Sequence, residues 1–228
     1  MSWIKLQMIK YIDRFRMAMQ KDILAIQYLA PLSKDYLPWN VASMRPSSIV
    51  VILNEIMLNE RRSVLECGCG ISTFYIASML QHRGAHLYTV ENDEAWAAKV
   101  MEILTRNGLE SYVTLINAPL SKTSLSMAGS LWYAEDNIRA HLKDIQIDLL
   151  IVDGPPASEK KDKYARYPAV PFARHYFGDD YTIILHDINR AGEQEIIKKW
   201  GRDLNITFEC RYRDGFIGVG RSRNALDV

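Results

Sequence analysis

Long apolar segments are missing from this sequence of 228 residues. No uncharged run approaches the roughly 20 residues that a membrane-spanning helix needs, and Lys5, Lys10 and Asp13 break any apolar core of a secretory signal. An excess of one charge is missing too, because 28 Lys and Arg nearly balance 27 Asp and Glu. Without a strong overall field, we expect neither a nucleic acid nor a membrane as a partner.

Cysteine is scarce as well. Cys67, Cys69 and Cys210 are odd in number and lack the paired C-x-x-C spacing of zinc sites. We therefore expect no disulfide framework and no zinc, and a reducing, cytoplasmic setting. Hydrophobic residues at 48% and charged residues at 24% are typical of a globular chain that closes a large core.

Signatures for phosphate-centred ligands are also absent. None of the 12 glycines is followed by lysine, which excludes a Walker P-loop, and no tyrosine has lysine four residues later, as in one common dehydrogenase dyad. These absences count against P-loop nucleotide hydrolases and against dehydrogenases that use this dyad.

What is present, from residue 63 onward, is an alternation of short apolar runs with helical patterns. The predicted strands cover residues 63–67, 86–91, 113–117, 148–153 and 181–187, and the predicted helices cover 72–81, 94–107, 137–144, 169–177 and 191–204. This alternation predicts a parallel sheet with helices on both faces. Asp214-Gly215 joins two further strands, 206–212 and 216–220, into an antiparallel hairpin. We predict an α/β fold with a Rossmann-like, doubly wound sheet of seven strands, the last one antiparallel.

The N-terminal segment shows apolar residues at helical spacing until Pro31 interrupts the pattern. We predict a helical arm and loop over residues 1–45, followed by the main domain over 46–228. Ser47 and Ser48 offer an N-cap for the first helix of that domain. The arm is expected to pack on the domain or on a second subunit, as in a homodimer.

The ends of the predicted strands carry the candidate chemistry, because ligands of open α/β sheets bind at that edge. The first strand runs into Glu66-Cys67-Gly68-Cys69-Gly70, a tight glycine turn that opens a helix. Glu91 closes the next strand about 20 residues later, where an acid can bind two ribose hydroxyls. The third glycine of the dinucleotide fingerprint is missing, because Thr73 stands in its place. The site is therefore a poor fit to a pyrophosphate.

These elements resemble the class I S-adenosylmethionine-dependent methyltransferases, over roughly residues 64–220. The matching motifs are Glu66-Cys67-Gly68-Cys69-Gly70, Glu91, Asp153-Gly154-Pro155-Pro156 and the closing hairpin. The resemblance implies that Gly68 and Gly70 line the methionine part of S-adenosylmethionine, with Glu66 near its amino group. It further implies that Glu91 holds the ribose. The cofactor set is completed by Ser72 beside the turn and by Asn117 and Ala118 near the adenine.

Within that superfamily, the motifs around residues 71–73, 153–156 and 186–187 look most like small-molecule and sugar O-methyltransferases. A hydroxyl acceptor must lose its proton, which favours a base at the reacting edge. His186 is the leading candidate, with Asp153 second and Asp187 beside them. Arg166, Tyr167 and Trp132 are the predicted acceptor-binding residues.

Magnesium at Asp153, Asp187 and Asn189 is a less favoured alternative, because Ile188 separates the Asp and Asn that are adjacent in catechol-type members. Two other functions stay open: an NAD(P)-dependent oxidoreductase on a Rossmann sheet, and a non-catalytic methyltransferase-like assembly module.

Overall fold

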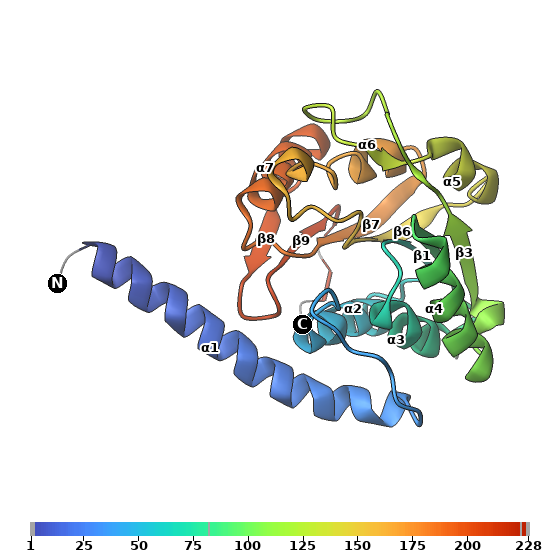
Figure 1. Ribbon diagram of the computed structural model, residues 1–228, viewed down its shortest axis with the longest axis horizontal. Helices are drawn as coiled ribbons and strands as arrows, with labels where there is room; N and C mark the ends of the chain where they lie inside the picture. Colours follow the sequence, from blue (N-terminus) through green and yellow to red (C-terminus); the bar gives the residue numbers. More distant parts are fainter. Residues whose placement is uncertain (1–2, 82, 224, 227–228) are drawn as a thin grey trace.

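The computed structural model describes residues 3–81, 83–223 and 225–226. Its centre is a seven-stranded sheet in the order β3-β2-β1-β6-β7-β9-β8 (Figure 1). Neighbours from β3 to β7 pair in parallel, whereas β9 pairs antiparallel with both β7 and β8. The strands are β1 (Ser63–Cys67), β2 (His86–Glu91), β3 (Val113–Asn117), β6 (Ile147–Val152), β7 (Phe177–Leu185), β8 (Phe208–Arg211) and β9 (Ile217–Arg221). The predicted Rossmann-like sheet with an antiparallel last strand is confirmed.

Helices cover both faces of the sheet, so each central strand buries side chains on both sides (Figure 1). In β6, Leu149 and Ile151 belong to one hydrophobic core, and Leu150 and Val152 to the other. The helices are α1 (Trp3–Leu29), α2 (Pro46–Leu58), α3 (Ile71–Leu80), α4 (Glu94–Arg106), α5 (Glu135–His141), α6 (Ala169–Ala173) and α7 (Ala191–Leu204), with short 3-10 turns at Ala30–Leu32, Glu110–Tyr112 and Lys160–Asp162. Within the described residues, none of these helices is long and apolar enough to cross a membrane.

The two largest differences from the sequence-based expectation are the start of β7 and a small extra ribbon. Strand β7 begins at Phe177, so the helix predicted over 169–177 is only the short α6. A small antiparallel ribbon of β4 (Leu120–Ser121) and β5 (Trp132–Tyr133) was not predicted. Two-residue strands are too short to show the alternation by which strands are recognised in a sequence.

The predicted N-cap for α2 is wrong. The helix begins at Pro46, with Arg45 in the N-cap position and no side-chain capping bond. The Ser47 hydroxyl donates instead to Asp22 of α1 at 2.6 Å, and the Ser48 hydroxyl donates to the Gly215 carbonyl at 3.1 Å. Both hydroxyls therefore bind residues that are distant in the sequence, and neither caps the start of α2.

Helix α1 extends well past the domain at its N-terminal end (Figure 1). Its small and apolar residues Ala18, Ala25 and Leu29 are buried, and Asp22 binds both the backbone and the side chain of Ser47. The second half of the arm is thus attached to the domain through α2.

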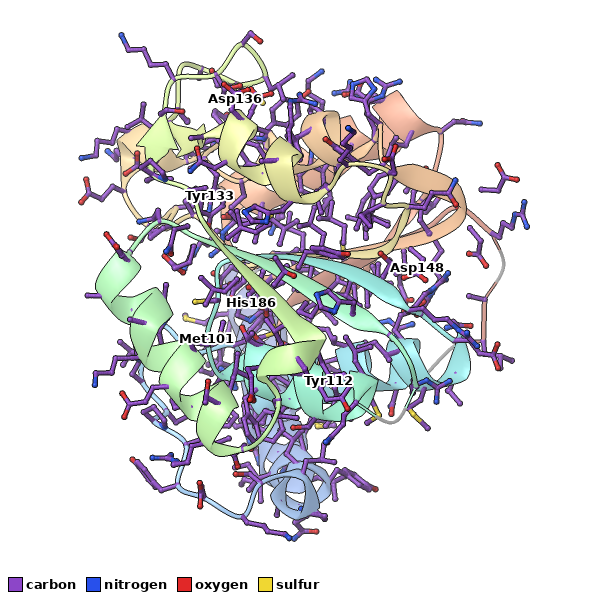
Figure 2. All side chains as sticks on the ribbon, turned by 90° about the vertical axis from the view of Figure 1, so that its right-hand side faces the viewer. Met101, Tyr112, Tyr133, Asp136, Asp148 and His186 are labelled. Carbon is purple, nitrogen blue, oxygen red and sulfur yellow. The ribbon has the colours of Figure 1, made fainter. Side chains whose placement is uncertain are left out.

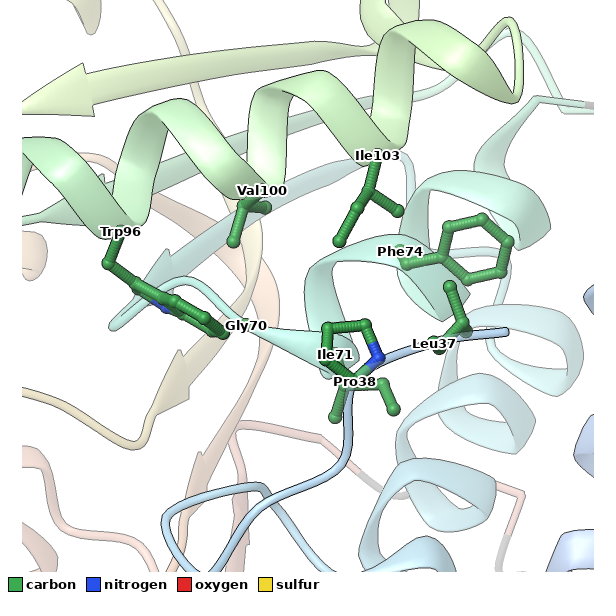
Figure 3. A pocket seen from close by; sticks show the side chains of 8 residues that line it. All are labelled: Leu37, Pro38, Gly70, Ile71, Phe74, Trp96, Val100 and Ile103. Carbon is green, nitrogen blue, oxygen red and sulfur yellow. The ribbon is translucent and has the colours of Figure 1, made fainter. Parts of the chain in front are cut away.

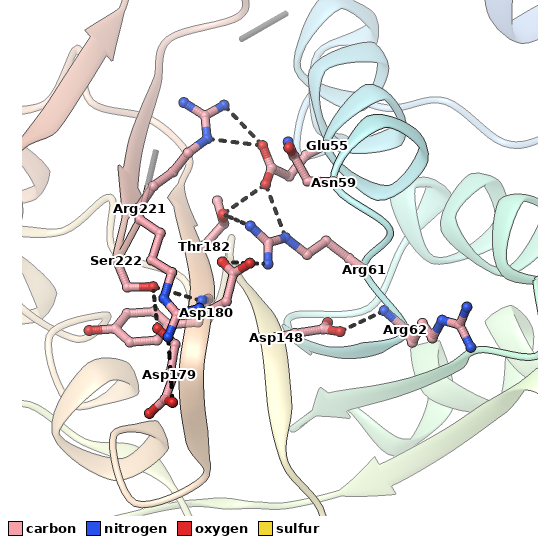
Figure 4. A network of polar contacts seen from close by, with 12 residues as sticks. Glu55, Asn59, Arg61, Arg62, Asp148, Asp179, Asp180, Thr182, Arg221 and Ser222 are labelled. Atoms are coloured by element: carbon pink, nitrogen blue, oxygen red, sulfur yellow. Dashed lines mark hydrogen bonds and ion pairs between the residues drawn. The ribbon is translucent and has the colours of Figure 1, made fainter. Parts of the chain in front are cut away.

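A buried charge network closes the edge of the sheet where the parallel strands begin (Figure 4). Glu55 of α2 is 0% exposed and accepts hydrogen bonds from Arg61, Thr182 and Arg221. Arg61, also buried, reaches Asp180 at 2.9 Å. The network joins α2 to the start of β1 and to the β7–β9 pair.

Candidate active site

The turn after β1 lies against the loop after β6 with two glycines in contact. Gly68 has a φ of +92°, and a Cβ there would lie 3.0 Å from the Gly154 nitrogen. A Cβ on Gly154 would lie 2.2 Å from the Tyr133 hydroxyl. Only glycine fits this close approach. Gly70, by contrast, faces open space, since a Cβ there would meet nothing within 4 Å.

Glu66 lies beneath this turn and is fully buried. Its carboxylate accepts hydrogen bonds from Ser72 and Thr73 at 2.6 Å each and from Thr89 at 2.8 Å. Burial raises the pKa of Glu66 to about 7, although the three hydroxyl bonds oppose the shift. The side chains of Glu66 and Ser72 thus bind each other. Together with Thr73 and Thr89, these bonds hold the start of α3 against β1 and β2.

Glu91 closes the turn from the side of β2. Its carboxylate accepts from the backbone amides of Cys69 at 3.2 Å, Asn92 at 2.7 Å and Asp93 at 2.8 Å. A carboxylate has about four acceptor positions, so it can still take a ligand hydroxyl. The carbonyl of Glu91 also accepts from the Ala118 amide at 2.8 Å. The ends of β2 and β3, which carry Glu91 and Asn117, thereby lie side by side.

An apolar pocket lies beside the same turn, between α3 and α4 (Figure 3). Trp96 lines it and donates its indole N–H to the Cys69 carbonyl at 2.9 Å. Leu37 and Pro38 from the N-terminal loop line its other side. Burial raises the pKa of the Cys67 thiol to about 12, which disfavours the reactive thiolate.

Asp153 and His186 meet where β6 and β7 end. Figure 2 shows His186 and Tyr133 toward one end of the sheet and Asp148 toward the other. The His186 Nδ1 lies 2.9 Å from Asp153 Oδ1. Because a carboxylate only accepts, Nδ1 carries the proton of this bond. Nε2 is buried and has no hydrogen-bond partner in the described part of the chain.

The charges around this pair shift both pKa values. Burial opposes the ionised form of Asp153, yet His186 and then Arg166 outweigh it and lower the pKa of the carboxyl. Burial likewise disfavours a charged His186 ring, but Asp153 outweighs it and raises the pKa of the imidazole. A raised pKa makes the neutral Nε2 a stronger proton acceptor.

Comparison with known proteins decides the family. A family model described as a methyltransferase domain matches residues 65–188, more than half of the chain. The chain belongs to this methyltransferase family. No curated protein matches the sequence significantly.

Solved structures resemble the methyltransferase over most of its length. The O-methyltransferase TomG from Streptomyces achromogenes, in complex with S-adenosylmethionine, is 16% identical with a TM-score of 0.54, covering 90% of this chain and 87% of that one. The S-adenosylhomocysteine-bound methyltransferase PaMTH1 from Podospora anserina is 15% identical with a TM-score of 0.58, covering 91% and 88%. An O-methyltransferase from Bacillus cereus in complex with S-adenosylhomocysteine is 15% identical with a TM-score of 0.52, covering 88% and 90%. At these identities the likeness concerns the fold.

The residues considered for magnesium do not fit a metal site in this methyltransferase. Asp153, His186 and Asp187 offer ligand atoms within 4.8 Å of one another, but arginines already engage both carboxylates. Arg166 contacts Asp153 at 3.3 Å and Asp187 at 3.1 Å, and Arg190 contacts Asp187 at 2.9 Å. Asn189 is exposed. Asp187 also caps no helix, because the N-cap of α7 is Arg190.

The predicted acceptor residues of the methyltransferase are buried. Trp132 is 1% exposed and packs against Tyr133 and Phe172. Tyr167 is 8% exposed, and its carbonyl accepts from the Trp200 indole at 3.0 Å. Arg166 is 4% exposed. Their role in acceptor binding stays a prediction.

The structure adds two residues that the sequence analysis missed, Arg190 and Glu193, which follow β7 around Asp187. It also places the hydroxyl of Tyr133, the neighbour of Trp132, against Gly154. Glu193 is 1% exposed, and burial raises the pKa of its carboxyl. The one sequence feature that could have pointed to Arg190 and Glu193 is the group of charged residues just after the fifth predicted strand.

Proposed function

We propose that the methyltransferase moves the methyl group of S-adenosylmethionine to a hydroxyl group of a small molecule or sugar. One observation carries this proposal. The open glycine turn, which Glu91 fixes, shares an edge of the sheet with a His186 ring whose Nε2 has no partner in the described residues. A cofactor site and a proton acceptor therefore lie at neighbouring strand ends. TomG, of the same fold, is bound to S-adenosylmethionine.

The residues around the turn fit this cofactor. Gly70 leaves room for the methionine part, and Glu91 keeps an acceptor position for a ribose hydroxyl. Asn117 and Ala118, beside Glu91, would contact the adenine. Gly68 sets the course of the turn through its contact with Gly154. Because Glu66 and Ser72 bind each other, they would act by holding the turn in place.

His186 supplies what a hydroxyl acceptor needs. S-Adenosylmethionine provides a methyl group on a positively charged sulfur, so that an O–CH3 bond forms as the S–CH3 bond breaks and the sulfur keeps the electron pair. The proton of the acceptor hydroxyl goes to Nε2 of His186. Asp153 holds the ring through Nδ1 and stabilises the charge that the ring gains. Alignment of the reacting atoms and exclusion of water supply most of the remaining rate.

Binding of S-adenosylhomocysteine tests the proposal without knowledge of the acceptor. At a ligand concentration of about 100 times Kd, we expect the free energy of unfolding to rise by about 2.7 kcal/mol. Glu91→Ala should weaken binding about 10-fold or more, because it removes a charge-assisted bond to the ribose and frees the Cys69 amide. Isothermal titration calorimetry measures the affinity, and urea denaturation with and without the ligand measures the free energy of unfolding.

The matched control is Glu94→Ala, an exposed acid at the start of α4, which should bind like the wild type. NADH is titrated in parallel. Binding of NADH in place of S-adenosylhomocysteine would favour the oxidoreductase. If the folded protein binds neither compound, the non-catalytic assembly module is the remaining interpretation.

We also propose a homodimer through α1 in a cytoplasmic setting. The helix exposes many apolar side chains, among them Met8, Ile12, Met19, Ile23 and Ile26, each more than half exposed. A 27-residue helix is about 40 Å long. A second copy offers a face of equal length and equal apolar character, as isologous pairing requires. The free thiols of all three cysteines support the reducing setting.

Sedimentation tests the dimer. The full chain is expected to sediment as a dimer. A chain without residues 1–17, which keeps the buried Ala18, Ala25 and Leu29 but loses about half of the exposed apolar face, is expected to fold and to dimerise more weakly. The double variant Ile12→Ser/Ile23→Ser should weaken the dimer without shortening the arm. A monomeric full chain would contradict the proposal.

A further inference from the structure

Arg166 is a buried cation whose contacts are all inside the site. It lies in the segment between β6 and α6 and is 4% exposed. Its Nη1 donates to the His186 carbonyl at 3.2 Å and to Asp187 at 3.1 Å, its Nε donates to the Pro155 carbonyl at 3.3 Å, and its Nη2 lies 3.3 Å from Asp153. One guanidinium thus joins the ends of β6 and β7.

The two carboxylates that Arg166 contacts are the ones that would otherwise bind a divalent cation. Asp153 and Asp187, with His186, form the group of clustered ligand atoms. A buried guanidinium requires anionic partners, and buried carboxylates require a cation. Arg166 meets both requirements at once, and Arg190 adds a second positive charge on Asp187. Two arginines therefore face two aspartates, and a third carboxyl beside them, that of Glu193, lies 3.9 Å from Arg190 with its pKa raised by burial.

The backbone strengthens this arrangement. Asp187 has a φ of +64°, a left-handed conformation that aspartate tolerates. The Ile188 amide that follows donates to the Phe216 carbonyl at 2.9 Å, which ties the turn to the closing hairpin. The Asp187 carboxylate is held where Arg166 and Arg190 both reach it.

We propose that Arg166 is a positioning residue that takes the place of a divalent cation between Asp153 and Asp187. The inference rests on the proposed methyl transfer, which it deepens. By holding Asp153 in place, Arg166 fixes the carboxylate that orients His186 with Nδ1–H toward it, so that Nε2 remains the proton acceptor. The fixed charge of an arginine makes the site independent of metal supply, because a guanidinium stays protonated at any physiological pH.

Titration with Mn²⁺ alone tests this inference, and neither cofactor nor acceptor is needed. The electron paramagnetic resonance signal of free Mn²⁺ reports how much metal is bound. We expect the wild type to bind Mn²⁺ weakly. We expect Arg166→Ala to bind it about 10-fold more tightly, because Asp153 loses its guanidinium partner and Asp187 keeps only its contact with Arg190. The double variant Arg166→Ala/Asp153→Asn should lose the new site.

Controls separate this result from a loss of structure. Arg174→Ala removes an exposed arginine just after α6 and should behave like the wild type. Arg166→Met keeps the apolar length of the side chain and serves if Arg166→Ala does not fold, as judged by circular dichroism. If neither variant folds, the wild-type titration decides.

Tight Mn²⁺ binding by the wild type would overturn the inference, and so would a folded Arg166 variant that gains no Mn²⁺ affinity. Calorimetry with S-adenosylhomocysteine is run on the same samples. A wild type that fails to bind S-adenosylhomocysteine contradicts the proposed function. The Mn²⁺ titration tests the role of Arg166 whether or not S-adenosylhomocysteine binds.

Discussion

Replacing His186 with alanine is expected to lower turnover by about 100-fold or more, which is the usual contribution of a positioned general base. The physical reason is the geometry of the ring. Asp153 occupies Nδ1 at 2.9 Å, and Nε2 has no partner in the described part of the chain. Without the ring, the proton of the acceptor hydroxyl has no nearby neutral base. Asp153 does not replace it, because its ionised form is stabilised by charge and its pKa is lowered.

Measurement requires an acceptor, which a screen for S-adenosylhomocysteine release among small hydroxylated compounds would supply. The affinity for S-adenosylhomocysteine should stay within about threefold of the wild type, since the role proposed for His186 concerns the acceptor and not the cofactor. His175→Ala, an exposed histidine near α6, is the matched control and should keep full turnover. Unchanged turnover in His186→Ala would remove this residue from the mechanism.

Replacing Glu55 with alanine is expected to destabilise the fold by about 3–5 kcal/mol, the range for breaking a buried ion pair on one side. Glu55 is 0% exposed and accepts from Arg61 at 3.1 Å, from Thr182 at 2.7 Å and from Arg221 at 2.9 Å. Its removal takes away the buried carboxylate that the Arg61 and Arg221 guanidinium groups share. Asp180 still contacts Arg61, but it is half exposed and compensates little.

Urea denaturation measures the loss of unfolding free energy, which lowers the urea concentration at the midpoint of unfolding. Glu55→Gln keeps the shape and one acceptor, so it should fall between alanine and the wild type. Glu102→Ala removes an exposed partner of Lys99 and should leave the midpoint unchanged. Because the network lies at the opposite edge from the glycine turn, folded Glu55→Gln should bind S-adenosylhomocysteine normally. Equal midpoints for Glu55→Ala and the wild type would contradict the role of this network.

The sequence was sufficient for the sheet because its strands are short apolar runs separated by helices of regular period. It was also sufficient to bring Glu91, Asp153 and His186 to one edge, because parallel strands end together. The buried bond between Asp153 and His186 follows from their neighbouring strands, β6 and β7. The sequence thus predicted which side chains lie near one another at this edge of the sheet.

The contacts of individual polar groups could not be predicted in the same way. The sequence placed Arg166 in a connection between elements, and it could not show that the guanidinium is buried and donates to the His186 carbonyl. Ser47 and Ser48 looked like caps, but Asp22 and Gly215, distant in sequence, take their hydroxyls. Such outcomes depend on tertiary packing, which no local pattern records.

The touching backbones of Gly68 and Gly154 have a consequence for how this protein can change. No side chain separates the turn proposed to bind the methyl donor from the loop that carries Asp153. A displacement of either segment is passed directly to the other, since no side chain between them can rearrange to absorb it. If the proposed function holds, a substitution at this contact that alters donor binding should therefore alter acceptor binding as well.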